Sequence, residues 1–264
     1  MVDRLKRSIS RLGRNVINGI WRFGSMARFF CLVIASSGTS FNRFRLVMRE
    51  VYFSGVLSLI IIVVSGLFVG MVLGLQGFET LQKYGATESI GVVVALSLVR
   101  ELGPVVSALL FASRAGSAIT AEIGLMKTTE QLTAMDMMAV SPMARVIAPR
   151  FWAGIISMPI LSWMFSAMGV FGGYVVGVVI IGVDNGAFWS QMQAAVDFQY
   201  DVLNGTVKSF VFGIAVTVIA TFEGYDAPPT AEGVSGATTR TVVTSALMIL
   251  ALDLVLTAFM LRQH

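Results

Sequence analysis

The chain has 264 residues, of which 56% are apolar and only 13% are charged, and its formal net charge is +4. Together with a mean hydropathy of +0.80, this composition excludes an ordinary soluble globular domain and predicts a protein that lies in lipid. More than half of the basic residues precede residue 51, so the positive charge favours anionic lipid headgroups over nucleic acid.

The first 50 residues form a basic N-terminal region with its own periodicity. Apolar side chains recur there at steps of three or four residues, at Leu5, Ile9, Leu12, Val16, Ile20 and Phe23. This spacing predicts an amphipathic helix that lies in the membrane interface; the alternative is a cytoplasmic tail packed on a partner. We expect no cleavable signal peptide, because the basic stretch is long and the apolar run at 29–35 is short. The lone Cys31 excludes an intrachain disulfide and, without a neighbouring His, offers no metal site.

The region 51–264 contains the apolar runs that can cross a membrane. A helix needs about 20 residues to span the hydrocarbon core, and four runs reach that length: 52–78, 89–111, 151–182 and 242–261. A fifth run, 205–222, is shorter and contains Lys208. None shows the alternation of a barrel strand, so we predict an all-α polytopic fold with about five transmembrane helices.

Lys and Arg in the short connections predict the orientation. Ten of them precede the first span, and further ones fall between the second and third spans and between the last two: Arg114, Lys127, Arg145, Arg150 and Arg240. The loop after the third span is acidic, with Asp184, Asp197 and Asp201. Five spans therefore place the N-terminus in the cytoplasm and the C-terminus on the outer side, and losing the run 205–222 would put Arg240 outside.

The segment between the second and third spans is patterned rather than a plain connector. Polar and apolar residues alternate over about 118–140, which predicts an amphipathic cytoplasmic helix closed by prolines at 142 and 149. Its candidate contact residues are Glu122, Gly124, Met126, Glu130, Gln131 and Met135. From the pattern alone, a loop helix lying on the membrane is the alternative.

Four ionisable residues fall inside the spans, where charge is costly unless it is paired or hydrated. They are Arg100, Glu101, Lys208 and Asp253. Arg100 and Glu101 are adjacent and so point in different directions toward other helices, whereas Lys208 is close enough to the outer end to snorkel. These four residues can form a buried ion network that fixes the register of the helices, or they can serve gating or headgroup binding. A proton relay is a further alternative, which is less favoured because no histidine lies among them.

Small residues and proline mark helix contacts within the spans. Glycines recur at four-residue spacing at Gly66, Gly70 and Gly74 and at Gly169, Gly173 and Gly177. Such spacing lets helices approach closely, although for the first set a groove for an acyl chain is also open. Pro104, after Gly103, favours a kink or break in the second span.

Enzyme signatures are absent from the sequence. There is no Gly-x-x-x-x-Gly-Lys-Ser/Thr loop, no Gly-x-Ser-x-Gly elbow and no His-Glu-x-x-His, and the only histidine is His264. We therefore expect no catalytic residue, no metal and no cofactor bound by this chain.

Several long motifs occur in one order along the chain. They are Arg-Glu-Leu-Gly-Pro-Val-Val at 100–106, Arg-Ala-Gly-Ser-Ala-Ile-Thr-Ala-Glu-Ile-Gly at 114–124, Thr-Glu-Gln-Leu at 129–132, Ala-Pro-Arg-Phe-Trp-Ala-Gly at 148–154, Gly-Tyr-Asp-Ala-Pro-Pro-Thr at 224–230 and Ala-Thr-Thr-Arg-Thr-Val-Val at 237–243. With these motifs the chain closely resembles the MlaE family of ABC-transporter permeases over nearly its whole length.

This resemblance implies a permease subunit, in a bacterial inner membrane, that moves glycerophospholipids between the inner and outer membranes and works as a homodimer. It implies a separate cytoplasmic ATPase that holds ATP and Mg and docks at the predicted helix around Glu122 to Met135, an outer ring of MCE-domain subunits and a small STAS-domain protein. A lipid cavity between the two copies would have walls at the outer end of the first span, at Leu73, Phe78, Leu81 and Tyr84. A stand-alone secondary carrier and a structural membrane anchor are the alternative functions.

Overall fold

The computed structural model describes residues 2–41 and 44–261, with side chains described for Ile17, 20–38 and 45–260. Across these ranges the chain is helical, without strands. Five helical segments are long and apolar enough to cross a membrane: Arg45–Gln82, Thr87–Thr128, Met143–Ile180, Phe198–Asp226 and Ala231–Met260. The prediction of an all-α polytopic membrane protein with five spans is confirmed.

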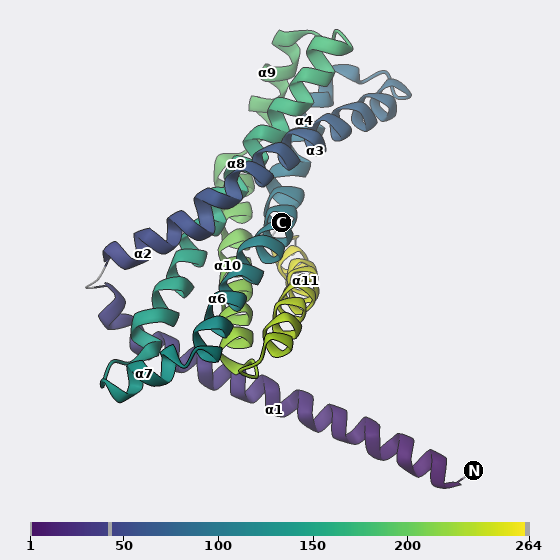
Figure 1. Ribbon diagram of the computed structural model, residues 1–264. Coiled ribbons are helices and arrows are strands. Elements are labelled where there is room, and N and C mark those ends of the chain that lie inside the picture. The colour runs from purple at the N-terminus through teal and green to yellow at the C-terminus, as the bar shows by residue number, and fades with distance from the viewer. Residues whose placement is uncertain (1, 42–43, 262–264) are drawn as a thin grey trace.

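The helices that build these segments are often joined by short π-helical turns rather than by loops. The first segment holds α2 (Phe44–Val51) and α3 (Leu57–Gln82), the second α4 (Ile90–Ser97), α5 (Gly103–Phe111) and α6 (Ser117–Thr128), the third α8 (Ala148–Tyr174), the fourth α10 (Leu203–Asp226) and the fifth α11 (Ala231–Leu261). Outside them lie α1 (Val2–Phe41), α7 (Gln131–Met137) and α9 (Asn185–Ala195). Figure 1 shows an elongated bundle with α3, α4 and α9 at one end and α1 and α7 at the other.

The second membrane segment is longer than predicted and passes through the Gly-Pro step without a break. Pro104 follows directly after the π-helical turn Leu98–Leu102 and stands in the first turn of α5, where a missing N–H is tolerated. The helix then continues as α6, in which Thr120 contacts α10 and α11. Its hydroxyl lies 3.0 Å from the Ala220 carbonyl and 2.8 Å from the Thr241 hydroxyl.

The two glycine sets face each other where α3 packs along α8. A Cβ placed on Gly70 would collide with the backbone of Gly169, and one on Gly74 would come within 3.3 Å of Gly173. Such close approach of backbones is what small residues at four-residue spacing permit. The first set is thereby occupied by helix packing and does not line a groove for an acyl chain.

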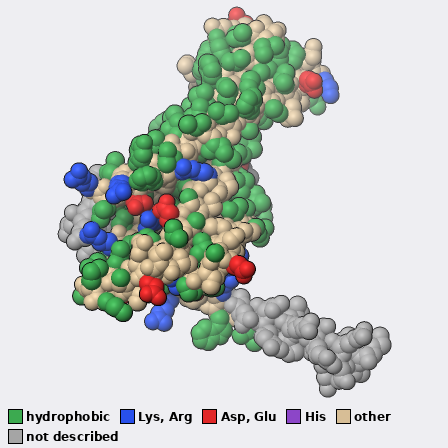
Figure 2. Space-filling view, viewed as in Figure 1, with side chains coloured by type: hydrophobic (Ala, Val, Ile, Leu, Met, Phe, Trp, Pro, Cys, Tyr) green, Lys and Arg blue, Asp and Glu red, His purple; other side chains and the backbone are tan. Residues whose placement is uncertain are grey.

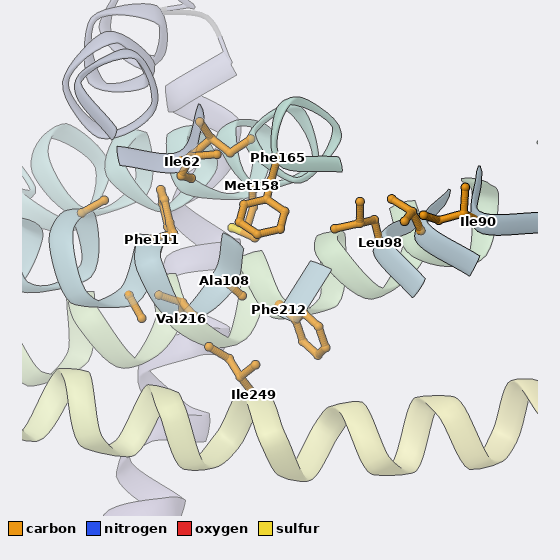
Figure 3. Packing of buried hydrophobic residues seen from close by; sticks show 14 of the residues in the cluster. Ile62, Ile90, Leu98, Ala108, Phe111, Met158, Phe165, Phe212, Val216 and Ile249 are labelled. Atoms are coloured by element: carbon orange, nitrogen blue, oxygen red, sulfur yellow. The ribbon is translucent and has the colours of Figure 1, made fainter. Parts of the chain in front are cut away.

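The core lies along the bundle axis. Buried apolar residues from all five membrane segments meet there, including Ile62, Phe111, Met158, Phe165, Phe212, Val216 and Ile249, as Figure 3 shows from close by. In the most apolar stretch of the fourth segment 44% of residues are buried, against 11% in the fifth. The run 205–222, which looked marginal for its length and its lysine, therefore forms a well-buried helix of the bundle.

Helix α1 crosses the α7 end of the bundle (Figure 1). Its C-terminal half packs into a second buried cluster through Phe29 and Val33, whereas Ile20 and Phe23 are 67% and 63% exposed. The predicted apolar residues Leu5, Ile9, Leu12 and Val16 lie outside the residues whose side chains are described, so the interfacial placement stays a prediction. Figure 2 shows broad apolar surface over the end with α3, α4 and α9, and charged side chains gathered toward the other end.

Candidate functional site

The four residues predicted as intramembrane charges gather in one network near the C-terminal end of α11. The Lys208 ammonium of α10 lies 2.8 Å from a Glu101 carboxylate oxygen and 3.3 Å from one of Asp253. It also donates to the Thr257 hydroxyl at 2.7 Å and to the Arg100 carbonyl at 3.2 Å. All four residues predicted as intramembrane charges are thus brought together, and three membrane segments meet at Lys208.

The Arg100 side chain extends the network to a residue that sequence reasoning missed. Its Nε lies 2.5 Å from Oδ1 of Asp201, and the other Asp201 oxygen accepts a hydrogen bond from the Asp197 backbone N–H at 2.8 Å. Asp201 was predicted to stand in an acidic outer loop, but it is only 1% exposed and lies in the helical turn that starts the fourth segment. Arg100 lies inside a predicted span and had no obvious acidic partner in the sequence. A search for that partner could have identified Asp201.

Lys208 does not snorkel toward water as predicted. Only 3% of its side chain is exposed, because the acceptors of Glu101, Asp253 and Thr257 surround the ammonium inside the bundle. A buried lysine stays charged only where nearby carboxylates and hydrogen-bond acceptors replace its water shell. Lys208 made the run 205–222 look less like a membrane span. In the structure it forms the ion pairs that join this helix to Glu101 and Asp253 on the neighbouring segments.

The two adjacent charges lie in a π-helical turn and have different partners. Arg100 and Glu101 both belong to the turn Leu98–Leu102, where one extra residue per turn changes the direction of successive side chains and the regular backbone ladder is interrupted. From this turn Arg100 reaches Asp201, and Glu101 reaches Lys208. Single-turn π-helices inside α-helices are often found at functional positions.

The network borders a small pocket of about 60 Å³ that opens beside α10. It is lined by Arg100, Glu101, Tyr200, Asp201, Asn204, Lys208, Thr257 and Met260. That volume suits a few water molecules or the polar part of a headgroup, not an acyl chain. The network contains two cations and three carboxylates, so its net charge is negative. A pocket with this charge suits water or an ammonium group better than an anion. Among the described residues no group of His, Cys, Asp and Glu could hold a metal ion.

The region predicted as a cytoplasmic helix over about 118–140 consists of two helices instead of one. Helix α6 is the end of the second membrane segment, and a residue with left-handed backbone, Glu130 at φ 58°, separates it from α7. Gly124 is buried against Val234 of α11, and Met126 and Met135 pack on the second buried cluster. Of the six predicted contact residues, Glu122, Glu130 and Gln131 are exposed.

Exposed apolar side chains surround α7 on this surface. Met137 is 84% exposed, Met138 67% and Leu125 60%. Met137 was not singled out from the sequence, because a run of alternating Met and polar residues does not reveal which side of so short a helix faces the bundle. Exposed methionines form an adaptable surface of the kind that partner proteins bind.

An ion-pair cluster connects α6 to its neighbours at the same end. Arg150 of α8 lies 3.0 Å from Glu122 and 3.5 Å from Glu50, which stands at the end of α2. The arginine is 12% exposed, whereas Glu122 is 53% exposed. Glu122, predicted as a contact for a partner, is thus also held by a partner inside the chain.

The residues predicted as walls of a lipid cavity lie at the opposite end of the molecule. Leu73, Phe78 and Leu81 are partly buried against the main core, and Tyr84, just beyond α3, is 81% exposed. Within this single chain the first three residues serve packing, and Tyr84 faces outward. Their role toward lipid stays a prediction.

Comparisons with known proteins agree with the motifs. The sequence model of the family described as Permease MlaE matches residues 47–259. The chain is 56% identical to the intermembrane phospholipid transport system permease protein MlaE of Haemophilus influenzae, over 96% of this chain and 97% of that protein. It is 36% identical to a probable ABC transporter permease protein of Rickettsia typhi, over 95% and 96% of the two chains. It is also 30% identical to the chloroplastic protein TRIGALACTOSYLDIACYLGLYCEROL 1 of Arabidopsis thaliana, over 80% of this chain and 60% of that protein.

Proposed function

The chain belongs to the MlaE permease family, and on that premise we propose that it is the membrane subunit of an ABC transporter that moves phospholipids between the inner and outer membranes of a bacterial envelope. The observation that carries this proposal is the 56% identity, across almost the full length of both chains, to a protein named for intermembrane phospholipid transport. The five membrane segments and the family match over 47–259 support it.

We propose that ATP and Mg are bound by a separate ATPase that docks on the surface formed by Leu125, Glu130, Gln131, Met137 and Met138. This surface is exposed and combines apolar with polar side chains, as protein interfaces do. It replaces the predicted docking set, of which Gly124, Met126 and Met135 face the bundle, while Glu122 borders the surface and is paired with Arg150.

A movement of the docking surface can reach the charge network along one helix. Glu101 and Glu122 stand on the same continuous membrane segment, Thr87–Thr128, and 21 residues at 1.5 Å each separate them by about 32 Å. That distance is close to the thickness of a hydrocarbon core. We propose that ATPase movements tilt this segment, and that the ion pairs at Lys208 transmit the tilt to α10 and α11.

Two copies of the chain would enclose the lipid. Helix α11 carries a largely exposed apolar face, including Leu247, Leu250, Leu254, Val255 and Phe259, which is available to a second copy. A homodimer could place Leu73, Phe78, Leu81 and Tyr84 of each copy around a lipid-sized cavity. An outer MCE-domain protein would continue the lipid path, and a STAS-domain protein would bind the ATPase. The N-terminus would lie in the cytoplasm and the C-terminus in the periplasm.

Affinity purification in mild detergent, with mass spectrometry of the proteins and lipids that come with the tagged chain, tests the assembly. We expect an ATPase, an MCE-domain protein and bound phospholipid. Recovery of the chain with lipid but without an ATPase would instead support a secondary carrier. In that case, transfer of lipid in proteoliposomes would follow an ion gradient, need no nucleotide and respond to Asp253→Asn.

The docking surface is tested with Met137→Asp and Glu130→Lys, using Phe198→Asp as the matched control. Met137 and Phe198 are 84% and 75% exposed, and Phe198 belongs neither to the docking surface nor to the proposed lipid cavity. We expect the α7 variants to insert normally but to lose the ATPase on purification and to lose ATP-dependent lipid transfer between vesicles. Equal recovery of the ATPase with all three variants would contradict the docking site.

A further inference from the structure

We propose that a groove between α1, α10 and α11 binds an anionic phospholipid of the membrane leaflet at the α1 end, with its phosphate on Arg22 and Arg240 and an acyl chain along α11. The site lies away from the charge network and does not depend on the direction of transport, or on transport at all. It is a lipid site on the flank of the bundle, beneath the helix that crosses its end.

The polar part of the site is one buried carboxylate shared by two arginines. Arg22 of α1 places Nη2 at 2.5 Å from one oxygen of Glu223, and Arg240 of α11 places Nε at 3.0 Å from the other. The Glu223 side chain is 5% exposed, whereas those of Arg22 and Arg240 are 45% and 43% exposed. One carboxylate between two guanidinium groups leaves an excess positive charge at the mouth of the groove.

The arginines keep donors for a second acceptor. Each contact with Glu223 uses one nitrogen of a guanidinium group that carries five N–H donors in a rigid fork. Such a fork matches the oxygens of a phosphate, and arginine is the preferred residue for this recognition. Two half-exposed arginines on adjacent helices can therefore hold a phosphodiester without releasing the buried carboxylate.

The apolar part of the site continues from the arginines into the membrane. Two adjoining hollows of about 190 and 260 Å³ share the residues Phe23, Met26, Ile219 and Met248. Each is larger than a cavity of about 150 Å³ that accepts benzene, so each accepts a section of a hydrocarbon chain. Arg240 and Met248 are eight residues apart on α11, so the groove runs about 12 Å inward from the charge.

The depth of the arginines agrees with the level of lipid headgroups. Glu223 lies three residues before the end of α10, and Arg240 lies in the third turn of α11, so both stand near the end of the membrane-crossing part. Helix α1 crosses the same end (Figure 1) and is held there by Phe29, whose ring lies 5.7 Å from that of Phe222. Positive charge at the interface next to an apolar groove selects an anionic amphiphile.

The test uses the full chain with its copurifying partners in nanodiscs of phosphatidylethanolamine and phosphatidylglycerol, with a trace of either lipid carrying a photoactivatable diazirine on one acyl chain. Cross-linked peptides are identified by mass spectrometry after illumination. We expect labelling of the α1 peptide that contains Phe23 and Met26 and of the α11 peptide that contains Met248, with phosphatidylglycerol preferred.

Matched pairs of variants separate the site from general contact with lipid. Met248→Trp fills the groove and should reduce labelling of the α1 peptide about fivefold, whereas Phe210→Trp, at a residue of α10 that is 45% exposed outside the groove, should not. Arg240→Gln removes the excess charge while the Arg22–Glu223 pair stays intact, and should reduce the preference for phosphatidylglycerol about fivefold. Arg28→Gln, at an exposed residue of the same helix as Arg22, should leave it unchanged.

Three results would overturn the proposal. Labelling of the α1 peptide that is equal in Met248→Trp and Phe210→Trp would show that no acyl chain occupies the groove. A lipid preference that does not respond to Arg240→Gln would remove the arginines from recognition. A disulfide between two copies of Thr244→Cys in a Cys31→Ser background would place a second copy of the chain over the groove, because Thr244 lines it. Each variant is first compared with the parent chain in elution volume and thermal stability, so that loss of folding is recognised.

Discussion

Replacing Lys208 by methionine tests whether the intramembrane charge network holds the bundle together. The substitution keeps the length and apolar stem of the side chain but removes the ammonium that lies 2.8 Å from Glu101 and 3.3 Å from Asp253. Removing one partner of a buried ion pair costs about 3–5 kcal/mol, because the remaining charge is left uncompensated. Glu101 and Asp253 are 43% and 23% exposed and regain some hydration, so we expect the lower end, about 3 kcal/mol.

The assay is the midpoint of thermal unfolding of the purified chain in detergent. For a chain of this size each kcal/mol corresponds to about 2–4 °C, so Lys208→Met should lower the midpoint by about 6–12 °C. The double variant with Asp253→Leu removes both charges and should recover about half of that loss. Lys83→Met, at an exposed lysine, should stay within about 2 °C. A double variant no more stable than Lys208→Met would refute the pairing of Lys208 with Asp253.

Two further predictions concern helix packing and orientation. Gly70→Ala should destabilise the chain by about 1–3 kcal/mol in the same assay, because its methyl group would collide with Gly169 of α8. Gly77→Ala on the same helix should be nearly neutral, because its methyl group would lie 3.8 Å from its nearest neighbour. Equal losses of stability in the two variants would contradict the packing of α3 on α8. In a cysteine-free background, Ser190→Cys in α9 should react with a membrane-impermeant maleimide in intact spheroplasts and Thr133→Cys in α7 only after permeabilisation; the opposite pattern would reverse the proposed orientation.

Hydropathy was enough to predict the five membrane segments but not where the second one ends. The prediction stopped at residue 111, where polar residues begin, whereas the helix continues to Thr128. Thr120 and Gly124 are polar or small because they face α10 and α11 closely, and a sequence pattern does not tell a polar residue in a helix contact from one in a loop. The proposed partner-binding region was consequently predicted as one helix instead of two.

The charge network was predictable in its members but not in its pairing. The free-energy cost of placing a charge inside the membrane was enough to identify Arg100, Glu101, Lys208 and Asp253, because ionisable residues at that depth need partners. The partner of Arg100 was missed because Asp201 stands in the turn before the fourth run, a position that reads as a loop when only apolar length is counted. The structure starts a helical turn at Phe198 and buries the aspartate within it.

The least apolar of the five segments is the most buried, and this reversal has a physical cause. Residues that face lipid have to be apolar, whereas residues that face other helices can be polar if they find partners there. Helix α10 contacts the rest of the bundle on most sides and therefore accommodates Lys208 and Glu223, each almost fully buried with two acidic or two basic partners. Helix α11 exposes Leu247, Leu254 and Phe259, so it is more apolar although it contributes less to the core. In this chain the weak hydropathy of a span with a lysine and a glutamate thus belongs to a well-buried helix, and its charged residues are the first to examine for function.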